Sequence, residues 1–343
     1  MKKSERIYIV IATAINSLII VLASMYVVGW VLSSRAAKAT VAAGSNLSFE
    51  YGKPIRVVLP DLVNPTHRLM QAGYLAACHD LGLWCETVSG NSDTIEAYVG
   101  QIELPISLGS SGVVVNLGAP VLYQAGIKLV NAGFPVVDAH SIIQTKDIPG
   151  LTAWVSADAT QYSKDAAAEM AKLIDCKGKV AVMQNGASDT ENAVGQGFSA
   201  ELKRLCPNVT VLGVQLETGD PVKGSAVDAA SIAANPDLTG AFSTTGGGPT
   251  SWSLALKQAG KQPGDIKVIG VDTTLQNLDT MKAGWVQALV AQPVYDEFYK
   301  GVEVVLAKLK GQQVSYENLL PAPIVRPADL PKYYKMLKDA GIN

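Results

Sequence analysis

The 343-residue sequence is short of charge, of aromatic residues and of histidine. Charged residues make up 17%, and 28 basic against 30 acidic side chains leave a formal net charge of −2. Without a basic surface to neutralise phosphates, we do not expect nucleic acid as the main partner. The three histidines, His67, His79 and His140, have no serine or cysteine nucleophile pattern beside them. The sequence therefore does not predict an enzyme.

Cysteine is also scarce, and its spacing argues against a metal site. The four cysteines form no CxxC pair and have no nearby histidine, so we predict neither zinc nor another cofactor. Cys176 and Cys206 each end a helical stretch just before a strand, while Cys78 and Cys85 flank one turn. Two disulfides, Cys78–Cys85 and Cys176–Cys206, are therefore predicted, with four buried free thiols as the alternative.

One long stretch has no charge at all. Residues 7–34 are uncharged and mostly apolar, and Lys2, Lys3 and Arg6 precede them. A basic start before an apolar run is typical of an export signal, and this run is long enough to cross a bilayer. Small-x-small patterns at 37–39 and 41–43 are candidate cleavage sites. The alternatives are a cleaved signal peptide and a retained inner-membrane anchor, and both place the remaining chain in the periplasm.

After a small, polar tether at 40–52, apolar strands alternate with helices. This alternation predicts an α/β protein with parallel sheets covered by helices on both faces. The predicted strands are 55–59, 84–88, 113–116, 135–138, 151–156, 179–183, 209–216, 240–243, 266–271 and 285–291. The predicted helices are 66–81, 93–108, 119–132, 159–174, 190–205, 222–235, 250–259, 275–283 and 295–309. A proline-rich tail from Ser315 ends in a short helix near 332–340.

Short polar side chains follow the strands in both halves. They are Asp61, Asn64, Asn116, Asp138, Gln184, Asn185, Thr244, Thr245, Asp272 and Gln292. Any one of them is explained by turn chemistry, but the repeated pattern predicts a binding edge, because ligands sit beyond the carboxyl ends of parallel strands. His67 and His140 lie near the same strand ends and are further candidates. Trp154 and Trp252, which could stack on a sugar, are more simply interpreted as core residues, as are Trp84 and Trp285.

Other short stretches carry a family resemblance. They are residues 55–65 with Asn64-Pro65, the run FPVVD at 134–138, SAD at 156–158, GQGF at 195–198, residues 255–260 and IGVD at 269–272. Their order and spacing resemble the type I periplasmic solute-binding proteins of sugar ABC transporters, the ribose-binding-protein-like group. Ala291-Gln292 falls where that family has a pocket glutamine.

The resemblance implies two Rossmann-like lobes joined by a hinge at Ala157 and Asp158, with one ligand between them. It implies an N-terminal lobe of 53–156 plus about 293–320, and a C-terminal lobe of 157–292 plus the tail 321–343, after segments 1–39 and 40–52. The chain is then a monomer that delivers a sugar, polyol or similar small polar solute to an ABC permease. Family pocket positions map onto Asn64, His67, Asp138, Thr245, Asp272 and Gln292.

The sequence also departs from the family pattern. An aromatic pair is replaced by Thr66 and His67, two arginines by Ala139 and Val194, and an Asn-Asp pair by Thr245-Gly246. Without the two arginines, the site lacks two guanidinium groups that each donate several charged hydrogen bonds. We therefore do not expect a ribose-like sugar bound in the way that is usual for the family. The alternative function is a periplasmic or membrane-anchored sensor that signals to a receptor kinase. A repressor core is excluded by the apolar segment that stands where a DNA-binding element would be.

Overall fold

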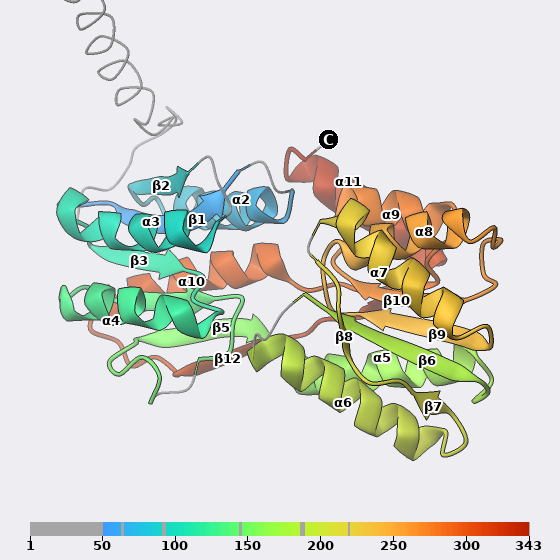
Figure 1. The fold of residues 1–343 in the computed structure, drawn as a ribbon. Helices are drawn as coiled ribbons and strands as arrows, with labels where there is room; N and C mark the ends of the chain where they lie inside the picture. The colour runs from blue at the N-terminus through green and yellow to red at the C-terminus, as the bar shows by residue number, and fades with distance from the viewer. Residues whose placement is uncertain are drawn as a thin grey trace, which may run out of the picture. The chain divides into compact units, whose positions relative to one another are not determined.

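The chain is described here by a computed structural model that covers residues 51–62, 65–90, 94–143, 146–185, 189–218 and 220–342. Its strands form two sheets with helices on both faces, so the predicted fold of two α/β lobes is confirmed (Figure 1). The predicted export segment, 7–34, and Asn64 lie outside the described residues. No helix in the described part of the chain is long and apolar enough to cross a membrane.

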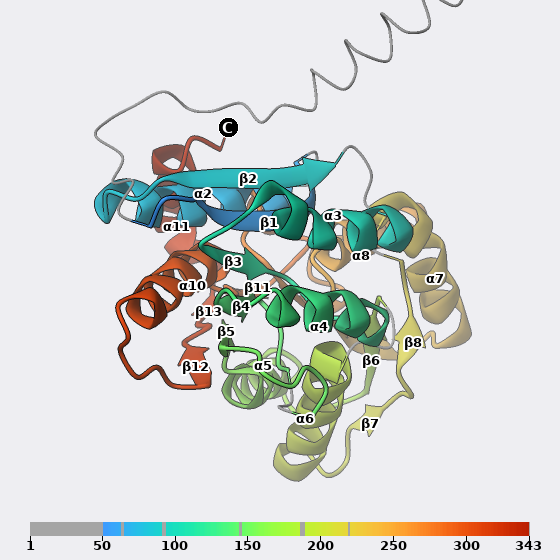
Figure 2. The ribbon, with the colours of Figure 1, turned by 90° about the vertical axis from the view of Figure 1, so that its left-hand side faces the viewer.

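The N-terminal sheet has the strand order β12-β5-β4-β3-β1-β2, and every pairing in it is parallel. Its strands are β1 (Ile55–Asp61), β2 (Cys85–Gly90), β3 (Gly112–Val115), β4 (Val136–Ala139), β5 (Ala153–Ala157) and β12 (Glu317–Leu320). Helices α2 (Pro65–Asp80) and α10 (Val294–Leu309) cover one face, and α3 (Ile95–Leu108) and α4 (Tyr123–Asn131) cover the other (Figure 2). A short helix, η1 (Pro120–Leu122), precedes α4.

The C-terminal sheet has the order β13-β11-β10-β9-β6-β7, and β8 also pairs with β6. Its strands are β6 (Lys179–Gln184), β7 (Thr210–Val211), β8 (Gln215–Leu216), β9 (Leu238–Ser243), β10 (Lys267–Val271), β11 (Ala288–Val290) and β13 (Ile324–Val325). Its helices are α5 (Ala159–Leu173), α6 (Asp189–Leu205), α7 (Pro221–Ala234), α8 (Gly248–Gln258), α9 (Leu275–Lys282) and α11 (Leu330–Asp339), with η2 (Pro327–Asp329) before α11.

The chain passes between the two sheets three times, after β5, after β11 and after β12. The third passage depends on the proline-rich tail, for which the sequence predicted no strand. Strand β12 pairs in parallel with β5, and β13 pairs antiparallel with β11. Both are too short for a visible apolar alternation, which is why the pattern of the tail hides them.

The prediction of one strand over 209–216 was wrong. The structure has two short strands there, β7 and β8, which pair with opposite ends of β6. Gly213 lies between them. A glycine weakens a strand from within, because it adds backbone entropy and no side chain to pack.

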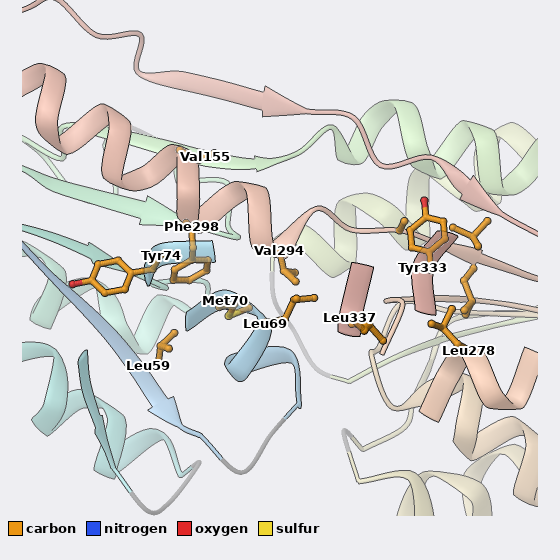
Figure 3. Packing of buried hydrophobic residues seen from close by; sticks show 14 of the residues in the cluster. Leu59, Leu69, Met70, Tyr74, Val155, Leu278, Val294, Phe298, Tyr333 and Leu337 are labelled. Carbon is orange, nitrogen blue, oxygen red and sulfur yellow. The ribbon is translucent and has the colours of Figure 1, made fainter. Parts of the chain in front are cut away.

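The cores form on both faces of each sheet, as expected for parallel strands buried on both sides. In β1, Val57 and Leu59 belong to the cluster that includes Phe298 of α10, whereas Val58 packs in a separate cluster with Tyr98 of α3. Figure 3 shows Tyr74 and Phe298 packed between α2 and α10. These two helices approach closely at Gly73, where a Cβ atom would lie 2.0 Å from the carbonyl oxygen of Tyr295.

The tryptophans divide between core and surface. Trp154 and Trp252 are 4% and 0% exposed, so their interpretation as core residues is confirmed. The same interpretation holds only in part for Trp84 and Trp285, which are partly buried. Trp285 lies at the edge of its cluster, with the Lys257 ammonium 5.2 Å from its ring centre.

Both predicted disulfides are present. Cys78–Cys85 joins the end of α2 to the start of β2, with Cα atoms 6.2 Å apart. Cys176–Cys206 joins the segments that follow α5 and α6, with Cα atoms 5.0 Å apart. Two intact disulfides agree with an oxidising compartment.

Candidate ligand cleft

A cavity of about 640 Å³ lies at the carboxyl ends of both sheets and takes its lining from both lobes. Its size is typical of small-molecule sites. Two further hollows, of about 560 and 530 Å³, flank Ile342 near the chain end and lack side chains from the strand ends. Six of the predicted ligand-binding residues line the large cavity: His67, Asn116, His140, Thr245, Asp272 and Gln292.

On the N-terminal side, Asp61 and His67 act as a pair. The Nδ1 atom of His67 lies 3.0 Å from Asp61 Oδ2, and Asp61 is 4% exposed. Burial lowers the pKa of His67, against the opposing effect of Asp61. A neutral ring that donates from Nδ1 to the carboxylate leaves Nε2 as an acceptor. Asp61 therefore orients His67 and is not itself among the lining residues.

Asn116 follows β3 and is held by backbone groups. Its Nδ2 donates to Ala139 O over 3.2 Å, and its Oδ1 accepts from Gly118 N over 3.1 Å. Tyr98, which sequence reasoning missed, donates from its hydroxyl to Asn116 O over 2.8 Å and also lines the cavity. Tyr98 lies within α3, where it resembles any buried aromatic residue, so no local signal could have identified it.

Asp138 takes a different position from the one the sequence suggested. It is 0% exposed, it is not among the lining residues, and its Oδ1 accepts from Leu117 N over 2.6 Å. Burial raises its pKa to about 7, against the hydrogen bond from Leu117 and the charge of His140. Asp138 therefore braces the loop after β3, and its predicted contact with ligand stays a prediction.

His140 and Asp272 occupy equivalent places in the two lobes. His140 follows β4 with φ 82° and donates its N–H to Val155 O, while Asp272 follows β10 with φ 68° and donates its N–H to Val290 O. Left-handed backbone is uncommon outside glycine, although Asp and His tolerate it better than most residues. In both lobes the turn directs a titratable side chain to the cavity.

Glu297, which sequence reasoning also missed, holds His140 and the end of β5. Its side chain is 0% exposed; Oε2 lies 2.7 Å from His140 Nδ1, and Oε1 accepts from Ala157 N over 2.8 Å. Burial opposes a charge on His140, but Glu297 and, more weakly, Asp272 and Asp138 raise its pKa to about 9. Glu297 sits in the first turn of α10, where an acid is ordinarily explained by the helix dipole.

On the C-terminal side, Asp272 is 7% exposed, and its Oδ1 is buried without a hydrogen-bond partner among the described residues. Burial raises its pKa to about 6, against the charge of His140. Gly246 makes room for it, because a Cβ atom there would lie 2.5 Å from Asp272 Oδ2. Nearby, Gln292 donates from Nε2 to Tyr162 OH over 3.3 Å, and both residues line the cavity.

The hydroxyl of Thr245 is hydrogen-bonded to a buried acid, Glu217. This hydroxyl donates to Glu217 Oε1 over 2.8 Å, and the Ser243 hydroxyl donates to the same oxygen. A second buried acid, Asp228 of α7, interacts electrostatically with Glu217 and accepts a hydrogen bond from the Ser251 hydroxyl. Burial raises the pKa of both acids, and the neighbouring charge of Glu217 adds to the rise for Asp228, to about 8. No sequence pattern links these acids, because they lie on different elements.

The predicted hinge residues stand where the chain first leaves the N-terminal sheet. Ala157 ends β5, and Asp158 caps α5 by accepting from Gln161 N over 2.9 Å. The Asp158 N–H donates to Leu320 O at the end of β12, which ties two of the three passages together. Their role as a hinge stays a prediction.

The raised pKa values predict how stability depends on pH. The folded pKa of His140 is about 9 against 6.5 unfolded, so its contribution is complete below pH 6.5 and is lost as pH rises through 9. The raised pKa values of Asp138, Asp228 and Asp272 act in the same direction, because their protonated forms are favoured in the folded state. We expect the free energy of unfolding to fall by on the order of 3 kcal/mol between pH 6 and pH 9.

Urea unfolding at a series of pH values checks this expectation. A Glu297→Gln variant provides the comparison, because its His140 has lost the main charge that raises the pKa, and its curve is expected to be flatter. A stability that rises between pH 6 and pH 9 would contradict the assignment of the charges.

The two lobes and the cavity between their strand ends define a class of protein, the two-lobed binders of small molecules. The chain belongs to the periplasmic binding protein family: a family model described as a periplasmic binding protein domain matches residues 55–313. This family binds solutes and is a non-enzyme class.

Individual relatives are distant. The ribose import binding protein RbsB of Salmonella typhimurium is 25% identical over 284 residues, which cover 82% of this chain and 92% of that protein. A solute-binding protein from Agrobacterium vitis, solved with α-D-tagatopyranose, superposes with a TM-score of 0.76 at 23% identity, covering 82% of this chain and 98% of the other. One from Agrobacterium radiobacter, solved with D-arabinose, gives 0.73 at 21%, with 82% and 98% covered. These structures share the fold.

Proposed function

We propose that the protein is the substrate-binding component of an ABC-type importer and binds a sugar or similar small polar solute between its lobes. The observation that carries the proposal is the cavity of about 640 Å³, which polar side chains from both sheets line. A solute that contacts both walls stabilises the closed arrangement, because only that arrangement completes its contacts. The relatives described above, a ribose import binding protein and two proteins solved with tagatose and arabinose, support a sugar.

The remaining parts of the proposal follow from this function. Residues 7–34 serve as the export segment, and a permease in the inner membrane accepts the loaded protein. The lobes are 53–156 with 293–320 and 157–292 with 321–343, and Ala157 and Asp158 act as the hinge. The residues proposed to contact solute are His67, Asn116, His140, Thr245, Asp272 and Gln292, together with Asn64.

A thermal-shift screen tests the proposal. The panel contains D-ribose, D-arabinose, D-tagatose, D-allose and D-fucose, their polyols, and amino and acidic derivatives of common hexoses. A ligand that binds only the folded state raises its stability by RT ln(1 + [L]/Kd), about 2.7 kcal/mol at one hundred times Kd. We expect at least one member to raise the melting temperature in this way. A panel without any response at millimolar concentration would count against a sugar-binding role.

A further inference from the structure

We infer that the solute carries a protonated amino group, bound against the C-terminal wall of the cleft by Asp272 and Thr245. The ligand class is then an amino sugar or amino polyol, rather than a neutral or acidic sugar. This inference rests on the proposed function, since it names the substrate class of the same cleft. Three features of the wall carry it: a carboxylate oxygen without a partner, a hydroxyl fixed as an acceptor, and a shortage of cations.

The first feature is Asp272, whose Oδ1 is buried and accepts no hydrogen bond from any described residue. The residue lines the cavity and is 93% buried, given its exposure of 7%. A buried carboxylate oxygen left without a donor destabilises the folded state, because it has lost its hydrogen bonds to water. The fold nevertheless maintains it, with a left-handed turn at Asp272 and a glycine at 246 that leaves space for the carboxylate. The missing donor is therefore expected from the solute.

The second feature is the orientation of the Thr245 hydroxyl. Its only proton is given to Glu217 Oε1 over 2.8 Å, and the Ser243 hydroxyl donates to the same oxygen and keeps Glu217 in place. A hydroxyl has one donor and two acceptor sites, so Thr245 Oγ1 retains acceptor capacity only. Asp272 and Thr245 thus offer acceptors, which a group with several N–H donors satisfies.

The third feature is the balance of charge. No lysine or arginine is among the described lining residues, and the undescribed internal residues 63–64, 91–93, 144–145, 186–188 and 219 contain none by sequence. Glu191 adds a second carboxylate to the lining. The cation nearby, His140, donates from Nδ1 to Glu297 and also faces Asp138 and Asp272. Around this imidazolium lie the three carboxyl groups of Glu297, Asp138 and Asp272. Because the acidic groups outnumber the one cation, the site attracts a cationic solute.

A neutral sugar can donate hydroxyl protons to Asp272, but it adds no positive charge to a site where one imidazolium faces several carboxyl groups. An ammonium group supplies both the donors and the charge, and hydrogen bonds between charged partners are about twice as strong as neutral ones. An acidic sugar places like charges together. The expected order of affinity is therefore amine, then neutral parent, then acid.

Calorimetry with matched pairs tests this order. D-glucosamine, D-galactosamine, D-mannosamine and glucamine are each titrated at pH 7 beside D-glucose, D-galactose, D-mannose and sorbitol, with D-glucuronate as the acid. We expect at least one amine to bind ten times more tightly than its neutral parent. In Asp272→Asn the ratio for that pair is expected to fall to within about threefold of unity, and in Thr245→Val to fall by a smaller factor. Asp265→Asn is the control, because Asp265 is exposed and accepts from Gln262 N in a surface turn.

The calorimetry separates the preference for an amine from its assignment to Asp272 and Thr245. If neutral parents bind as tightly as the amines or more tightly, the inference is wrong and the proposed function stands. If an amine is preferred but Asp272→Asn, folded by its melting temperature, keeps that preference, the amine site lies elsewhere and the assignment is wrong. Should Asp272→Asn fail to fold, an unchanged ratio in Thr245→Val overturns the assignment instead. If no member of this panel binds at millimolar concentration while a neutral sugar of the thermal-shift panel does, the inference is wrong and the proposed function stands. If neither panel gives binding, both are wrong.

Discussion

Replacing Glu297 with alanine is expected to lower the free energy of unfolding by about 3–5 kcal/mol. The side chain is 0% exposed and has two partners, His140 Nδ1 at 2.7 Å and Ala157 N at 2.8 Å. Its removal takes away the main charge that keeps the buried imidazole protonated and leaves a buried N–H without an acceptor. For this reason, removing one partner of a buried ion pair lowers stability strongly, even where the intact pair contributes little to the free energy of unfolding.

Urea unfolding at pH 7 measures the effect, and two variants sharpen it. Glu297→Gln keeps an oxygen for Ala157 N and loses only the charge, so we expect a smaller loss than for alanine. Glu303→Ala lies in the same helix, where its carboxylate pairs with Lys300 and is 40% exposed, and a change of under 1 kcal/mol is expected. Equal losses for Glu297→Ala and Glu303→Ala would show that the buried network does not hold this region.

Removing the Cys176–Cys206 disulfide is expected to lower the free energy of unfolding by about 3.6 kcal/mol. The two cysteines are 30 residues apart, and the chain-entropy relation gives that value for a loop of this length. The same relation gives about 2.4 kcal/mol for Cys78–Cys85, whose separation is 7 residues. The longer loop restricts the unfolded chain more, so its loss costs more.

Paired serine variants, Cys176→Ser with Cys206→Ser and Cys78→Ser with Cys85→Ser, allow a direct comparison in urea. Which disulfide costs more when it is removed is a better test than either value alone, because the expected entropic effect of a disulfide acts through the unfolded state. A larger loss for the 7-residue loop would mean that local packing around α2 and β2, and not chain entropy, determines what each disulfide contributes.

The sequence predicted most of the fold because the fold depends on repeated local patterns. Apolar runs such as that of β1 are visible wherever both faces of a strand are buried, and the glycines and polar residues that end them are equally local. The short strands β12 and β13 were missed because they form only by pairing with β5 and β11, which lie far away in the sequence. Pairing partners of this kind leave no periodic signal.

The candidate site was also predicted from local sequence patterns, and the prediction missed the contacts that depend on residues far away in the chain. Residues directly after strands, such as Asn116, His140 and Asp272, reach the cavity because parallel strands end at one edge. Asp138 ends the predicted strand 135–138, but β4 continues to Ala139, and the Asp138 side chain accepts from the backbone N–H of Leu117. Glu297 and Glu217 act on the cavity through other residues, from positions far away in the chain. Such supporting contacts depend on tertiary structure and cannot be inferred from spacing.

Small-angle X-ray scattering of the purified protein, with and without the tightest ligand from the screen, tests whether a bound solute brings the two lobes together. Binding between the lobes requires them to approach, since each wall supplies only part of the contacts. We expect a smaller radius of gyration at saturation, together with loss of that change in Asp272→Ala at the same ligand concentration. Superimposable scattering curves for free and saturated protein would contradict a solute held between two closing lobes.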